Sequence, residues 1–124
     1  MIPLTDDLQL DLEKAKYQFS MNAPSVVILN ALSNVTGYVL PVAELFLMAK
    51  EYGAITVLDA AQAAGLIDLN MPTLNADILC FAGHKTLMGP FGIGGFLIKH
   101  GITLKKELTG GTGSASLTLD MPEE

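Results

Sequence analysis

The chain has 124 residues and a formal net charge of −6, from seven basic and thirteen acidic residues. Half of it is hydrophobic, which excludes a disordered chain and is enough for one packed domain or part of one. The single cysteine excludes an internal disulfide, and the acidic balance with no arginine makes a nucleic-acid partner unexpected.

The first third of the chain predicts a helix and then a strand. Residues 1–7 carry two acids and lack the basic start of a signal peptide. Asp11 can cap a weak helix that runs to about Ser20. Residues 25–32 form a nearly continuous apolar run, typical of a strand buried on both faces of a parallel sheet. Residues 17–43 are uncharged, but prolines and asparagines interrupt them, so no membrane span is expected.

The middle of the chain predicts a helix between two further strands. Pro41 suits a first helical turn, and Gly53 suits the end of that helix. The apolar run 54–58 predicts a second strand that ends at Asp59, and residues 78–82 predict a third. This order indicates an α/β fold with a parallel sheet.

A fourth apolar run, residues 96–98, follows a turn rich in glycine and proline at residues 89–95. The loop between the third and fourth strands shows no helical pattern. Because a parallel return needs a long crossover, the fourth strand could return antiparallel.

Polar residues follow three of the predicted strands. Asn34 follows the first strand, Asp59 and Gln62 the second, and His84 and Lys85 the third. The carboxyl ends of parallel strands lie at one edge of a sheet, which is where ligands bind in such folds. We therefore expect these five side chains to meet at one edge.

This set of groups suits pyridoxal 5'-phosphate (PLP). A lysine amine can form a Schiff base with its aldehyde, and an aspartate can keep its ring nitrogen protonated. Gln62 and Asn34 could donate to the phenolic oxygen, and His84 could reach the phosphate or the substrate. Taken singly, each residue has an ordinary role: Asp59 in a cap or turn, Asn34 in a turn, and Lys85 and His84 on a solvated loop.

Several motifs together resemble the class V aminotransferase family. They are SNVTG at residues 33–37, LDAAQ at 58–62, and GHK at 83–85, which glycines at 89–94 follow. The resemblance runs from about Ile2 to Glu124, and the cysteine desulfurase and selenocysteine lyase branch is the most similar. It implies part of the large domain of PLP fold type I, mostly parallel with one antiparallel strand after the lysine loop. On this view residues 1–124 lack that domain's N-terminal segment and the C-terminal small domain.

The resemblance also implies roles for the site residues. Lys85 would form the Schiff base with PLP as an internal aldimine, and His84 would lie beside the phosphate. Asp59 would pair with the pyridine nitrogen, while Gln62 and Asn34 would contact the phenolic side of the ring. The family implies a homodimeric enzyme acting on a small amino acid, here the removal of sulfur from L-cysteine. The single cysteine separately indicates a reducing, cytoplasmic compartment. No metal is implied.

Other readings stay open from the sequence. The chain could be another class V enzyme, such as an aminotransferase, an epimerase or a carbon–sulfur lyase. It could also be a catalytically inactive fragment or scaffold. A nucleotide-binding domain is the weakest reading, because the glycines at 89–95 precede a strand and not a helix.

Three positions bear on these readings. Cys80 lies inside a predicted strand and is expected to be a small buried hydrophobe, not a catalytic thiol. Ala82 stands where many family members carry a hydroxyl that binds the phosphate. The glycine-rich residues 110–116 could form a phosphate-binding nest, but a lone motif of this kind is weak.

Overall fold

The computed structural model describes residues 2–105, so the glycine-rich segment 110–116 lies outside the described residues. The elements are two helices and four strands: α1 (Leu12–Met21), β1 (Val26–Asn30), α2 (Val42–Glu51), β2 (Ile55–Asp59), β3 (Ile78–Ala82) and β4 (Gly94–Ile98). Each element appears where the sequence predicts it, with strand ends that differ by one or two residues.

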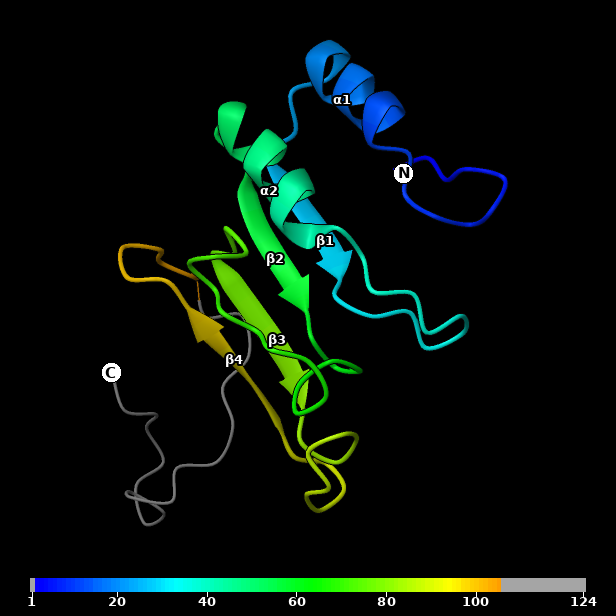
Figure 1. The fold of residues 1–124 in the computed structure, drawn as a ribbon. Helices are drawn as coiled ribbons and strands as arrows, with labels where there is room; N and C mark the ends of the chain where they lie inside the picture. Colours follow the sequence, from blue (N-terminus) through cyan, green and yellow to red (C-terminus); the bar gives the residue numbers. More distant parts are fainter. Residues whose placement is uncertain (1, 106–124) are drawn as a thin grey trace.

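The four strands form one sheet in the order β1-β2-β3-β4 (Figure 1). β1, β2 and β3 run parallel, and β4 returns antiparallel to β3. This arrangement confirms the predicted α/β class and the antiparallel fourth strand. The parallel direction sends the chain out of β1, β2 and β3 at the same edge of the sheet.

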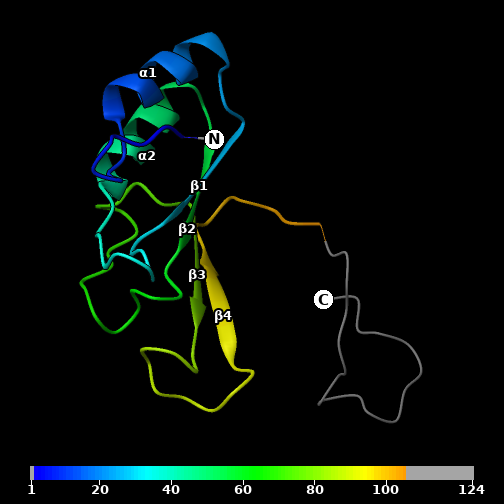
Figure 2. The ribbon, with the colours of Figure 1, turned by 90° about the vertical axis from the view of Figure 1, so that its right-hand side faces the viewer.

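Both helices lie on the same side of the sheet, where α2 packs against β1 and β2 and α1 packs against α2 (Figure 2). α1 begins after Asp11, whose carboxylate accepts a hydrogen bond from the Lys14 amide at 2.9 Å, as an N-cap should. α2 begins directly after Pro41 and is followed by Gly53, whose φ of +73° suits glycine. The core between helices and sheet is apolar, and its largest fully buried apolar side chains are Phe46, Leu45 and Leu58.

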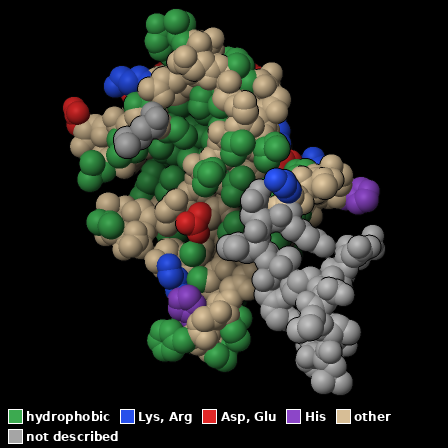
Figure 3. All heavy atoms as spheres, turned by 180° about the vertical axis from the view of Figure 1, so that it is seen from behind, with side chains coloured by type: hydrophobic (Ala, Val, Ile, Leu, Met, Phe, Trp, Pro, Cys, Tyr) green, Lys and Arg blue, Asp and Glu red, His purple; other side chains and the backbone are tan. Residues whose placement is uncertain are grey.

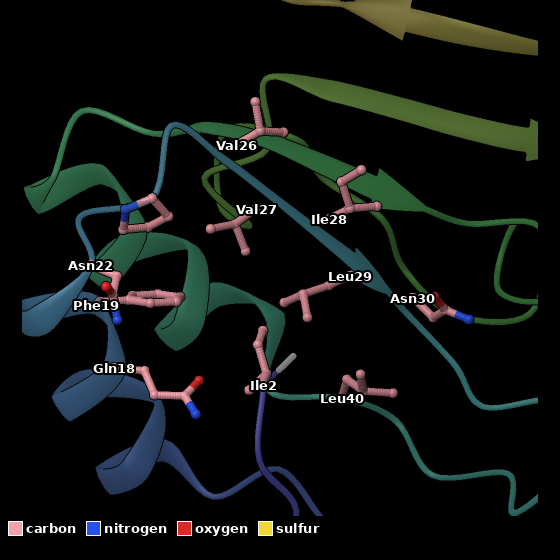
Figure 4. Close-up of a pocket in the computed structure, with 11 residues that line it drawn as sticks. Ile2, Gln18, Phe19, Asn22, Val26, Val27, Ile28, Leu29, Asn30 and Leu40 are labelled. Atoms are coloured by element: carbon pink, nitrogen blue, oxygen red, sulfur yellow. The ribbon is translucent and has the colours of Figure 1, made fainter.

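The prediction that the first strand is buried on both faces is wrong. Val27 and Leu29 are buried, but Val26 is 51% exposed and Ile28 is 64% exposed. Figure 4 shows these two pairs pointing to opposite sides of β1. The cause is that, within residues 2–105, both helices lie on the same face. The opposite face carries a broad group of hydrophobic side chains (Figure 3).

A buried polar cluster joins the amino ends of β2 and β3. Asp77 is only 4% exposed, and its Oδ2 accepts hydrogen bonds from Lys50 Nζ and from the Thr56 amide at 3.0 Å. Lys99 Nζ lies 3.8 Å from Asp77 Oδ1. Burial by itself raises the pKa of Asp77, but the hydrogen bonds from Lys50 and Thr56 outweigh burial and lower that pKa below its ordinary value.

Candidate active site

The end of β2 and the loops that follow β1, β2 and β3 carry the five predicted site residues at one edge of the sheet (Figure 1). Asp59 is the last residue of β2, level with Asn30 of β1 and Cys80 of β3. Asn34 lies on the loop after β1, and Lys85 lies on the loop after β3. The parallel direction of β1, β2 and β3 places these three segments at the same edge of the sheet.

Asp59 is held by the turn that follows it. Its Oδ1 accepts a hydrogen bond from the Ala61 amide at 2.9 Å, and the residue is half-buried. The Asp59 carboxylate therefore stabilises the turn after β2, and the same hydrogen bond fixes its orientation. Within residues 2–105 its other oxygen, Oδ2, makes no hydrogen bond, which leaves it available to a ligand.

Lys85 lies on a loop whose backbone is closed on itself. The Gly83 amide donates to Ile93 O and the Gly89 amide donates to Gly83 O, both at 2.7 Å. A Cβ at Gly89 would lie 2.8 Å from Gly83 O, so this closure needs glycine. The Lys85 carbonyl accepts from the Met88 amide at 2.9 Å. The Lys85 side chain is exposed and has no hydrogen bond or ion pair in the described part of the chain.

His84 is supported by two residues from the far end of the same loop. Its Nδ1 lies 3.4 Å from Ile93 O. Its ring stacks on Phe91, with centroids 5.7 Å apart and an angle of 28° between the planes. Phe91 is 93% exposed and was not singled out in the sequence, because nothing in a glycine-rich loop distinguishes a phenylalanine that stacks on a histidine nearby in space.

The two amides, Asn34 and Gln62, lie on neighbouring loops. Asn34 is exposed in a turn where Ser33 Oγ accepts from the Thr36 amide at 3.2 Å. Gln62 is half-buried in the turn after β2. Among residues 2–105 neither side chain makes a hydrogen bond. The segments that carry the five residues thus leave the sheet at the same edge, but among residues 2–105 no hydrogen bond joins Asn34, Gln62 and Lys85 to one another.

Other candidate features among the described residues lie apart from the five predicted site residues or are absent. A hollow of about 690 Å³ runs along β1 beside α1 and is lined by none of the five residues (Figure 4). Cys80 is half-buried in β3. Residues 2–105 contain no group of three His, Cys, Asp or Glu side chains that could hold a metal, and no helix there is long and apolar enough to cross a membrane.

Comparison with known proteins gives consistent matches. The family described as Aminotransferase class-V matches residues 1–121. A cysteine desulfurase of Nostoc sp. is 41% identical over 103 residues, which cover 83% of this chain and 25% of that protein. A probable cysteine desulfurase 2 of Mycobacterium leprae is 38% identical over 119 residues, covering 94% of this chain and 28% of that protein. The chain therefore spans about a quarter of the length of these relatives.

Solved structures agree with the sequence matches. The apo cysteine desulfurase from Thermococcus onnurineus NA1 superposes with a TM-score of 0.74 at 41% identity, covering 81% of this chain and 24% of that one. The cysteine desulfurase CsdA from Escherichia coli gives a TM-score of 0.68 at 29% identity, covering 79% of this chain and 24% of that one. These neighbours confirm the expected fold type I architecture.

Proposed function

Because this chain belongs to the class-V aminotransferase family, we propose that it is part of the large domain of a PLP-dependent cysteine desulfurase. Relatives named as cysteine desulfurases, including those 41% and 38% identical, support the activity. The observation that carries the cofactor site is the gathering of Lys85, Asp59 and the two amides at the carboxyl edge of the sheet. The proposed domain occupies residues 1–124.

The residues at this edge fit PLP by their chemistry. The cofactor needs an amine for its aldehyde, and Lys85 offers one that is exposed and unpaired among residues 2–105. It needs an anion for its ring nitrogen, and Asp59 offers Oδ2 on a carboxylate already oriented through Oδ1. PLP supplies an electron sink for the substrate's α-carbon when it is bound.

Each of the five side chains has a task at a stated atom. Lys85 Nζ would hold the cofactor through its aldehyde, and the Lys85 amine would carry a proton to or from the substrate's α-carbon. Asp59 Oδ2 keeps the proton on the ring nitrogen. The amide nitrogens of Gln62 and Asn34 donate to the phenolic oxygen, and His84 serves the phosphate or substrate side.

The substrate we propose is L-cysteine, a small amino acid, from which sulfur is removed. The names of the relatives support this choice. We also propose that the whole protein works as a homodimer in the cytoplasm. The free Cys80 is compatible with that reducing compartment. Cys80 takes no part in sulfur transfer in this account, because it is half-buried in a strand.

The test is an absorption titration of the chain with PLP. We expect a visible band that borohydride removes in the parent chain and in Lys16→Ala, but that is absent in Lys85→Ala. Lys16 is the matched control because it is also an exposed lysine, but on α1. An equal band in Lys85→Ala would contradict the proposed cofactor site. A Lys85-dependent band without alanine formation from L-cysteine, measured with dithiothreitol present as the reductant that takes up the sulfur as sulfide, would leave a chain that binds PLP but is catalytically silent by itself.

A further inference from the structure

One side-chain hydrogen bond joins the loop after β2 to the loop after β3. The Thr86 hydroxyl donates to the carbonyl oxygen of Ala64, a residue 22 positions earlier in the chain. Thr86 directly follows Lys85, and Ala64 lies two residues after Gln62. This bond therefore connects the segment that carries the proposed Schiff-base lysine to the segment that carries the proposed ring-binding groups.

Close packing surrounds this hydrogen bond. A Cβ at Gly65 would lie 3.1 Å from Leu87 Cδ2 and 3.4 Å from the Thr86 carbonyl oxygen. Gly65 also has a φ of +85°, a conformation that favours glycine. The two loops thus approach closely at Ala64 and Gly65 on one side and at Thr86 and Leu87 on the other.

We propose that Thr86 is a positioning residue for Lys85, and this inference rests on the proposed function. Thr86 is half-buried and tied to Ala64, whereas the neighbouring Lys85 is exposed and has no partner among residues 2–105. The hydroxyl fixes the backbone next to the lysine while it leaves the amine free. It also sets the distance between the lysine loop and the turn that begins at Asp59. Amine and carboxylate can then face the same cofactor without rearrangement, which lowers the cost of binding.

The hydroxyl is the group that matters in this account. Serine at position 86 keeps a donor for Ala64 O, whereas valine keeps the branched shape and loses the donor. A structural contribution from side-chain volume alone would be preserved in Thr86→Val and reduced in Thr86→Ser. A contribution from the hydrogen bond gives the opposite order.

The experiment compares Thr86→Val and Thr86→Ser with the parent chain. Thr73→Val is the matched control, because the Thr73 hydroxyl donates to Asn70 Oδ1 at 3.0 Å in an exposed turn away from the lysine loop. One readout is amide hydrogen exchange at Gly83 and Gly89 without PLP. The other is the amount of pyridoxyl group fixed by borohydride on Lys85 relative to Lys16.

We expect Thr86→Val to exchange these amides faster and to lower the ratio of Lys85 to Lys16 labelling about tenfold. Thr86→Ser and Thr73→Val should behave like the parent chain. Labelling in Thr86→Val equal to the parent would overturn the positioning role, whatever the exchange rates. A parent chain that labels Lys85 no more than Lys16 would show that the proposed cofactor site itself has failed, and the positioning role would fall with it.

Discussion

The two edges of the sheet differ in whether polar side chains are buried and hydrogen-bonded or exposed and without a partner. At the amino edge, Asp77 is buried and its carboxylate is bound by Lys50 and by the Thr56 amide. At the carboxyl edge, the side chains of Lys85 and Asn34 are exposed and make no hydrogen bond among residues 2–105. The difference teaches that stability and proposed function are separated along the strands.

The physical reason lies in the cost of burying polar groups. A charge removed from water must be paired, and in the described residues no buried side-chain nitrogen or oxygen lacks a partner. Groups left in water can stay unpaired at no such cost. The carboxyl edge can therefore keep the exposed Lys85 amine and the exposed Asn34 amide ready for a ligand, while the amino edge stabilises the fold. Each prediction below tests one edge through stability, PLP binding or both.

The largest effect on stability is expected at the amino edge. Asp77→Asn removes the charge that Lys50 and the Thr56 amide bind, and should lower the free energy of unfolding by about 2 to 3 kcal/mol. Urea denaturation measures the change. Asp68→Asn is the control, since it removes the same charge from an exposed residue. A loss no larger than that of the control would show that the buried cluster does not stabilise the fold.

A smaller effect, on binding and not on stability, is expected at the carboxyl edge. Asp59→Asn keeps an acceptor for the Ala61 amide, so the free energy of unfolding should change by less than about 0.5 kcal/mol. Loss of the charge should weaken PLP binding about tenfold, or about 1.4 kcal/mol. Titration of the visible band measures this affinity. PLP affinity unchanged from the parent, with Asp68→Asn as reference, would remove Asp59 from the proposed site.

The smallest effect is a dependence of stability on pH. The pKa of Asp77 is lowered in the folded chain, against its burial, by the hydrogen bonds from Lys50 and Thr56. Its contribution is therefore complete above the ordinary value of 3.8 and is lost as the pH falls through the lowered folded pKa. Asp11 also loses its contribution to stability as the pH falls, because hydrogen bonds from the Lys14 amide and side chain lower the pKa of Asp11.

Urea denaturation between pH 5 and pH 2 checks the sign. The free energy of unfolding of the parent chain should fall toward acid. In Asp77→Asn it should fall less, because only the contribution of Asp11 is still lost. A parallel dependence in both chains would assign the acid sensitivity to other carboxylates.

Local patterns were enough to predict the elements and the parallel direction of β1, β2 and β3, while the antiparallel β4 was left open by the patterns and implied by the family resemblance. Apolar runs located β1, β2 and β3, and the short loop without a helical pattern was compatible with an antiparallel β4. The same patterns did not predict which face of β1 is covered. The same apolar run suits a strand covered on one face and a strand covered on both. Which face of β1 is covered depends on where α1 and α2 lie.

For the candidate site too, the sequence predicts the positions of residues along the sheet but not the contacts between loops. The positions of Asp59 and Lys85 at the edge follow from strand direction alone. The bond between Thr86 and Ala64, and the stack of His84 on Phe91, depend on how loops fold back in space. No residue type or spacing in the sequence signals such contacts, so only the structure identifies them.

The central claim is that the carboxyl edge, and Lys85 in particular, binds PLP. The most direct measurement is to treat the parent chain with PLP and borohydride, digest it, and quantify the pyridoxyl group on each of its seven lysines. The account predicts that Lys85 carries most of the label, well above the exposed Lys16. A label distributed evenly over the exposed lysines would contradict it.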